Sequence, residues 1–177
     1  ESQVDIECFL TNLKIKKSEN NDISLTTYKL RKNNDCFEFS LTNEDRPVNF
    51  TSDLLGYTLT IDGLDVTNLV TIEQNVLRFI PNLQNLPLSL QTINEKDVVL
   101  EVWSKKNPNV NAKAISKFTL IESIYEVKMV NSQDTSVDIY DLKNCKAKIY
   151  YKISVDGHDF SKQELIDALN DGLIEID

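Results

Sequence analysis

Few side chains in this sequence have the types and spacing that catalysis requires. The 177 residues include one histidine, His158, directly after the turn-like pair Asp156-Gly157. A Ser-His-Asp triad would have to use this imidazole, and the sequence has no nucleophile elbow of the form G-x-S-x-G. We therefore expect His158 to be a solvent-exposed turn residue. Pairing of its imidazole with a cysteine thiol, brought close by the fold, stays open as the alternative.

Three cysteines, Cys8, Cys36 and Cys145, are widely separated and form no CxxC pair. A structural zinc site is therefore not expected. We expect buried, reduced thiols, with a Cys8–Cys36 bridge as the alternative if their strands pair. The four glycines are dispersed and match neither GxGxxG nor GxxxxGK, which excludes the familiar phosphate-binding loops.

Carboxylates cluster at Asp62 and Asp65 and again at Asp134, Asp138 and Asp141. Calcium requires six to eight oxygen ligands, and the Asp62–Asp65 turn offers two carboxylates, so ordinary turn chemistry is the preferred interpretation. Two acids distant in sequence can converge for glycoside hydrolysis, so this catalytic route is also left open. We expect no enzyme activity, no cofactor and no bound metal.

The aromatic residues suggest binding rather than catalysis. Trp103 and Tyr57 lie in strand-like segments and are our candidates for contact with a ligand or partner, although aromatic residues on strands are more often part of the core. The net charge of -9 opposes binding to nucleic-acid phosphate and to anionic membranes. The sequence also has no apolar stretch near the roughly 20 residues that a membrane helix needs.

Alternation of apolar and polar residues predicts the elements that must position these side chains. Phe37, Phe39 and Leu41 alternate with polar neighbours, as do Tyr57, Leu59 and Ile61. Further strands are expected at Val4–Cys8, Ile23–Leu30, Val66–Ile72, Val76–Ile80, Val98–Ser104, Ala114–Ile121, Ile124–Met129, Ser136–Asp141, Ala147–Val155 and, as a short return, Leu173–Ile176.

The C-terminal region differs from the rest of the chain. Ser161-Lys162-Gln163-Glu164 fits a capping box, which predicts a short helix at Lys162–Asn170 ending before Gly172. The predicted fold class is mostly β: an antiparallel immunoglobulin-like sandwich with a small C-terminal β-hairpin plus one short α-helix. We expect a sandwich domain at 1–122 and a strand-strand-helix extension at 123–177, packed on the sandwich or on a partner.

The stretch from Leu30 to Phe50, with the turns Lys32–Asp35 and Asn43–Pro47 around an alternating strand, resembles the opening hairpin of the N-terminal domain of baseplate upper proteins from tailed phages of Gram-positive bacteria. Leu55–Ile61 resembles that family's next strand, and Val76–Pro81 and Val98–Trp103 would be later strands. The similarity covers about residues 23–121. It implies an immunoglobulin-like virion module that docks onto a baseplate, often as a trimer, and it brings no catalytic residues.

The function expected from these observations is a non-enzymatic structural or assembly module of a phage tail baseplate that supports host attachment. Its partners would be proteins, including copies of itself, and its location the virion. The alternative is a secreted or surface-exposed β-sandwich that binds a glycan or a host protein through Trp103 or Tyr57.

Overall fold

The computed structural model describes residues 9–130 and 150–173. The chain forms two compact units. The first comprises Glu1–Leu25 and Lys29–Ile121, and the second comprises Thr26–Tyr28 and Glu122–Asp177. No helix among the described residues is long and apolar enough to cross a membrane.

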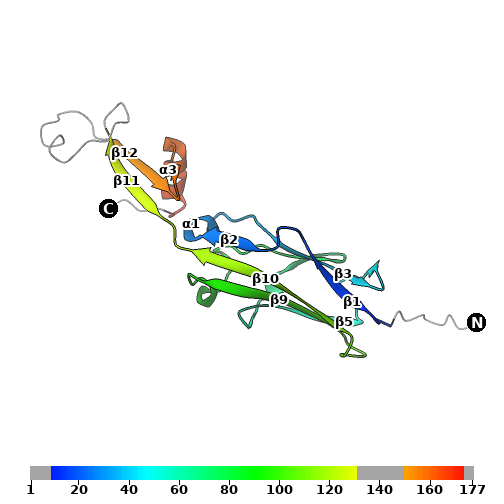
Figure 1. Cartoon of the computed structure of the whole chain (residues 1–177). Helices are drawn as coiled ribbons and strands as arrows, with labels where there is room; N and C mark the ends of the chain where they lie inside the picture. Colours follow the sequence, from blue (N-terminus) through cyan, green and yellow to red (C-terminus); the bar gives the residue numbers. More distant parts are fainter. Residues whose placement is uncertain (1–8, 131–149, 174–177) are drawn as a thin grey trace, which may run out of the picture. The chain divides into compact units, whose positions relative to one another are not determined.

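The first unit contains two sheets (Figure 1). One has the order β1-β3-β8-β7, with β4 also paired to β3. Its strands are β1 (Leu13–Lys17), β3 (Phe37–Asn43), β4 (Arg46–Pro47), β7 (Thr71–Glu73) and β8 (Val76–Phe79). The other sheet has the order β2-β10-β9-β5-β6. Its strands are β2 (Ile23–Thr26), β5 (Leu55–Ile61), β6 (Leu64–Asp65), β9 (Glu95–Ser104) and β10 (Asn111–Ile121).

This strand order confirms the predicted class of fold. The pairs β1–β3, β3–β8, β7–β8, β5–β9 and β9–β10 are all antiparallel. In immunoglobulin-like sandwiches the first, second, fifth and fourth strands form one sheet, and the third, sixth and seventh form the other. Here β1, β3, β8 and β7 correspond to the first, second, fifth and fourth strands of that fold, and β5, β9 and β10 correspond to the third, sixth and seventh.

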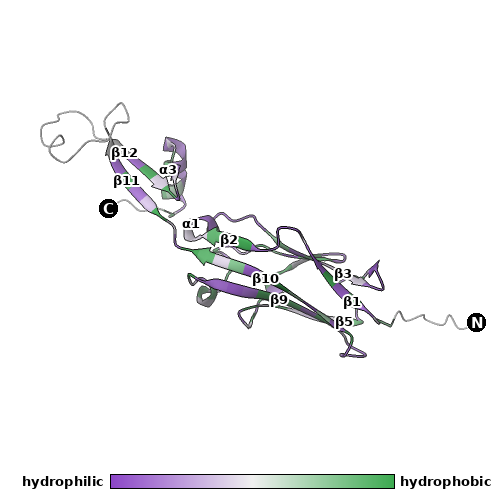
Figure 2. Cartoon of the chain, viewed as in Figure 1, coloured by the Kyte–Doolittle hydropathy of each residue, from purple (hydrophilic) through white to green (hydrophobic). Residues whose placement is uncertain are grey.

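The core lies between the sheets because each strand turns alternate side chains inward. In β3 the inward residues Phe37, Phe39 and Leu41 are fully buried. The Phe37 ring lies 6.5 Å from Phe79 of its own sheet and 6.3 Å, edge-on, from Phe118 of β10 in the other sheet. Such aromatic pairs add to the stabilisation from burial alone. Hydrophilic and hydrophobic residues consequently occur along the same strand, as the ribbon of β10 shows (Figure 2).

Tight turns connect neighbouring strands where Asp and Gly were expected to reverse the chain. Asp62 and Gly63 have φ values of 47° and 80°, as a two-residue type I′ turn requires. The β3–β4 hairpin uses the same positive-φ geometry, but with Glu44 at 50° and Asp45 at 60°. Left-handed backbone costs a non-glycine residue about 1–2 kcal/mol, so this hairpin stores some strain.

The second unit is a small sheet with a helix. Its strands are β11 (Tyr125–Val130), β12 (Tyr150–Val155) and β13 (His158–Asp159), in that order. The helix α3 has the predicted bounds, Lys162–Asn170. The capping box is also confirmed, because the Ser161 side chain accepts from the Glu164 amide and the Glu164 side chain accepts from the Ser161 amide.

Two predicted strands were wrong in part. The strand expected at Ile23–Leu30 stops at Thr26 and continues as α1 (Thr27–Leu30), because the Tyr28 amide donates to the Ser123 hydroxyl instead of to a neighbouring strand. Within the strand expected at Val66–Ile72, the 3₁₀ turn η1 occupies Thr67–Leu69, and only Thr71 and Ile72 lie in a strand, β7. The loop before β9 holds a second 3₁₀ turn, η2 (Leu88–Leu90).

Four strands were not predicted, namely β1 and the two-residue strands β4, β6 and β13, and some predictions cannot be compared. Three of the five residues of β1 are lysines, which hides the alternation typical of a strand. The expected strands at Val4–Cys8 and Ser136–Asp141 lie outside the described residues. So do residues 147–149 of the strand expected at Ala147–Val155 and residues 174–176 of the strand expected at Leu173–Ile176.

Candidate functional site

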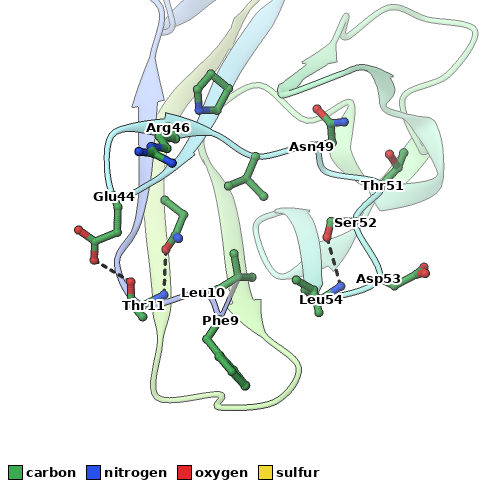
Figure 3. Close-up of a pocket in the computed structure, with 13 residues that line it drawn as sticks. Phe9, Leu10, Thr11, Glu44, Arg46, Asn49, Thr51, Ser52, Asp53 and Leu54 are labelled. Carbon is green, nitrogen blue, oxygen red and sulfur yellow. Dashed lines mark hydrogen bonds between the residues drawn. The ribbon is translucent and has the colours of Figure 1, made fainter. Parts of the chain in front are cut away.

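A large pocket lies in the first unit, and three segments line it (Figure 3). These are the N-terminal segment before β1, the β3–β4 hairpin and the loop from β4 to β5. Its volume is about 1020 Å³ and it is open to solvent. The lining residues are Phe9, Leu10, Thr11, Asn43, Glu44, Arg46, Pro47, Val48, Asn49, Thr51, Ser52, Asp53 and Leu54. We call it the end pocket.

Side-chain hydrogen bonds fix one wall of the end pocket. The Asn43 Oδ1 accepts from the backbone amides of Thr11 and Asn12, at 2.9 and 2.8 Å. The Thr11 hydroxyl donates to Glu44 Oε1 at 2.6 Å, and the Glu44 amide donates to the Asn12 carbonyl at 3.3 Å. The N-terminal segment is therefore tied to the hairpin across 31–33 positions of sequence.

The loop from β4 to β5 forms the other wall and is anchored by a buried aromatic ring. Phe50 is 1% exposed and meets Tyr57 edge-on at 5.4 Å. The Phe50 amide donates to the Gln74 carbonyl at 3.2 Å, and the Ser52 amide donates to the Asn49 carbonyl at 3.0 Å. The Ser52 hydroxyl accepts from the Leu54 amide at 3.3 Å. Both walls are thus set by the fold rather than by a ligand.

The chemistry of the end pocket suits binding. Leu10 is buried and Val48 and Leu54 are half-buried, so the lining has an apolar part. The exposed side chains of Arg46, Asn49 and Asp53 surround it, and none of the three makes a hydrogen bond or ion pair within the described residues. Arg46 offers hydrogen-bond donors with a positive charge, Asp53 offers acceptors with a negative charge, and the Asn49 amide offers both kinds of group. An arrangement of acid, base and nucleophile is not found among the lining residues.

An exposed aromatic ring lies at the edge of this pocket. The Phe9 side chain is 63% exposed, and Figure 3 shows it projecting from the N-terminal segment. The Lys106 Nζ lies 5.0 Å from the centre of the Phe9 ring, within the range of a cation–π contact. This contact supports Phe9 from the loop between β9 and β10.

The two predicted contact residues lie on opposite faces of their sheet. Tyr57 pairs with the buried Val102 and packs inward against Phe50, so it belongs to the core side. Trp103 pairs with Gly56, one position along, and is half-buried on the outer face, where it lines a smaller pocket of about 400 Å³. The structure therefore does not bring Trp103 and Tyr57 together into one site.

The His158 side chain makes a structural hydrogen bond within the second unit. Its Nε2 lies 2.7 Å from Glu164 Oε2, and its side chain is 64% exposed. The hydrogen bond from His158, reinforced by the Ser161 amide, lowers the pKa of Glu164. The imidazole thus joins β13 to the first turn of α3. No partner with nucleophilic chemistry contacts it among the described residues.

The carboxylates of Asp62 and Asp65 in the acidic turn accept hydrogen bonds from backbone amides. Asp62 Oδ1 accepts from the Asp97 amide at 3.0 Å, and Asp65 Oδ1 accepts from the Thr67 amide at 2.8 Å. The hydrogen bonds from Thr67 lower the pKa of Asp65. Within residues 9–130 and 150–173, no three His, Cys, Asp or Glu side chains are grouped as metal ligands. The acids Asp134, Asp138 and Asp141 lie outside the described residues.

Cys36 is the one cysteine that the structure describes, and it is free. Its side chain is half-buried, and burial raises the pKa of its thiol. Cys8 and Cys145 lie outside the described residues. A protonated, partly covered thiol of this kind is a poor nucleophile.

Sequence reasoning did not find the end pocket. The turn at 43–47 was recognised, but the segment at 9–11 carries no signal that it would meet that turn. Only the exposed Phe9 next to Leu10 hints at an apolar surface there.

No family model, curated protein or solved structure matches the chain. The strand order and the chemistry of the two pockets are therefore the observations from which a function has to be argued.

Proposed function

We propose that this chain is a non-enzymatic assembly module of a phage tail baseplate, and that it holds another virion protein in the end pocket. The resemblance of residues 23–121 to baseplate upper proteins supports the assignment to a phage tail baseplate. The loop-lined pocket supports the docking role, since binding residues are often carried by loops on a rigid sandwich.

One observation carries the docking role. The side chains of Arg46, Asn49 and Asp53 surround an apolar lining and have no partner within the described residues. A protein partner would use the apolar part for one hydrophobic side chain and the unused polar groups for orientation. Because Asn43 and Phe50 already fix the walls, little conformational entropy would be lost on binding.

The charges indicate which segment fits. Arg46 would pair with a carboxylate or a backbone carbonyl of the partner, and Asp53 with an amide or a basic side chain. The partner segment would therefore present an apolar residue between an acceptor and a donor. The open shape of the end pocket favours such a peptide segment over an enclosed small molecule.

The experiment is co-purification of the chain with the other tail proteins of its virion, followed by calorimetry with the protein captured. Arg46→Glu should weaken binding at least tenfold, because it replaces an attractive charge by a repulsive one. Lys16→Glu makes the same change of charge at an exposed position of β1 and should leave the affinity unchanged. Circular dichroism establishes that both variants are folded.

Two results would refute the proposal. One is the failure of the folded wild-type chain to bind any tail protein. The other is equal affinity of the Arg46→Glu and Lys16→Glu variants, which would place the contact elsewhere.

A further inference from the structure

A second binding surface lies on the outer face of the sheet that contains β5, β9 and β10. Gly56, Trp103 and Asn111 are direct partners across these three strands. A Cβ atom at Gly56 would lie 2.5, 2.6 and 2.7 Å from Cε2, Cζ2 and Nε1 of the indole. The ring therefore lies across the glycine and uses the space that any side chain there would occupy. One indole face is covered by β5.

The rest of the indole lines a pocket of about 400 Å³, with Glu101, Pro108 and Asn111 among its walls. The Asn111 Nδ2 donates to the carbonyls of Pro108 and Asn109, at 3.1 and 3.2 Å. Its Oδ1 remains as an acceptor of fixed orientation. We call this surface the Trp103 face.

The charge on the Trp103 face is balanced. Glu101 Oε1 lies 3.4 Å from Lys113 Nζ, and both side chains are about half exposed. The second carboxylate oxygen of Glu101 stays available. The indole N–H has no partner among the described residues and is not buried, so it can donate.

We infer that the Trp103 face is a subsite for the pyranose ring of a neutral glycan. The C–H face of a sugar ring would stack on the indole, whose π-face attracts such weakly positive hydrogens. The sugar hydroxyls would donate to Glu101 and Asn111 and accept from the indole N–H. This inference concerns a different surface from the end pocket and does not depend on the proposed function.

Other ligand classes fit the same surface less well. A cationic ligand would compete with Lys113 for the Glu101 carboxylate, and the pocket has no second acid among its lining residues. A nucleotide would bring phosphate to a chain of net charge -9, with no cationic side chain among those lining residues. A neutral ligand rich in hydroxyl groups satisfies every unused group without adding charge.

Because Trp103 is the only tryptophan, its fluorescence reports on this surface alone. The full chain is titrated with glucose, galactose, mannose and N-acetylglucosamine, each to about 100 mM, a range that detects affinities of only a few kcal/mol. At least one sugar should give a saturable change in emission, and calorimetry should return the same Kd.

Two matched variants locate the site. Glu101→Gln should raise the Kd about tenfold, since a charge-assisted hydrogen bond becomes a neutral one. Glu95→Gln makes the identical change at the other end of β9, where Glu95 pairs with Thr119 and lies far from the Trp103–Asn111 pair. This control variant should bind like the wild type. Trp103→Phe, measured by calorimetry, should bind more weakly than the wild type.

Three outcomes would overturn the inference. The first is no saturable response to any of the four sugars from the folded chain. The second is calorimetric binding without a change in Trp103 emission, which would place the sugar elsewhere. The third is equal Kd values for Glu101→Gln and Glu95→Gln.

Discussion

The contact between Gly56 and Trp103 leads to a quantitative prediction for Gly56→Ala. The new methyl group would approach the indole to 2.5–2.7 Å, whereas carbon atoms in contact prefer about 3.5–4.0 Å. The ring must therefore move by about 1 Å. Since Trp103 is only half-buried, it can swing away from the sheet without displacing the core.

The size of the effect follows from two opposing contributions. Overpacking of a well-packed contact costs about 1–3 kcal/mol. Replacing glycine by alanine in a strand returns about 0.5–1 kcal/mol, because the unfolded chain loses freedom. The clash dominates, so the free energy of unfolding should fall by about 1–2 kcal/mol. With a urea dependence of about 1–3 kcal/mol/M, the midpoint should drop by roughly 0.3–2 M.

A double-mutant cycle separates this mechanism from a backbone effect. Gly56→Ala should lower the urea midpoint and shift the emission of Trp103. In a Trp103→Ala background the same substitution should be neutral or slightly stabilising, because the indole is gone. Gly63→Ala serves as the control, since it is strained by a φ of 80° but has no atom within 4 Å of the new methyl group. Its Trp103 emission should stay unchanged. An equal loss of stability with and without the indole would refute the reasoning.

Three further predictions concern single residues. Asp45→Gly should raise the free energy of unfolding by about 0.5–1 kcal/mol, because φ is 60° there; a lower urea midpoint would contradict this. Lys96→Met should lower the free energy of unfolding by about 1–3 kcal/mol, because Lys96 is 1% exposed and donates to Asn94 Oδ1 at 2.6 Å. An unchanged urea midpoint would show that this hydrogen bond does not stabilise the fold. The hydrogen bond from His158 lowers the pKa of Glu164, so the contribution of this carboxylate to the stability of α3 is present above its ordinary pKa and is lost as the pH falls through the lowered pKa. Amide exchange in α3 should speed up at that point, and Glu164→Gln should abolish the pH step.

The sandwich was predictable where the local pattern and the tertiary structure agree. Phe37, Phe39 and Leu41 alternate with polar residues, and they form the centre of the core. The capping box at Ser161 specified α3 to the residue, because a helix start depends on neighbours within one turn. Such local signals require no knowledge of the rest of the fold.

Prediction failed where distant residues decide. Thr26 and Thr27 favour a strand by their β-branched side chains, but the hydroxyl of Thr27 accepts from the Ser123 amide, 96 positions away, where the chain forms a helical turn. In β1 the lysines conceal the inward pair Leu13 and Ile15, because an edge strand needs few apolar residues. The end pocket joins residues 9–11 to residues 43–54, a contact that depends on Asn43 and that no local pattern encodes.

The faces of Tyr57 and Trp103 could not be assigned from sequence for a related reason. Side chains alternate along a strand, so a shift of one residue in register exchanges the inner and outer sets. The pairing of Tyr57 with Val102 fixes the register and sends Tyr57 into the core. Trp103 must then point outward, opposite Gly56.

The same register explains why the two binding surfaces that we propose both lie outside the filled interior of the sandwich. Fully buried residues such as Phe39 and Leu100 occupy the inward faces of both sheets. The side chains that remain accessible to a partner lie at the strand ends and on the outward faces. The proposed contact groups of the end pocket lie on β4 and the loop after it, and include Arg46, whereas the Trp103 face presents a ring that lies across a glycine. Since the two surfaces share no lining residue, substitution of Arg46 and of Glu101 should act independently, and each ligand can be tested without disturbing the other.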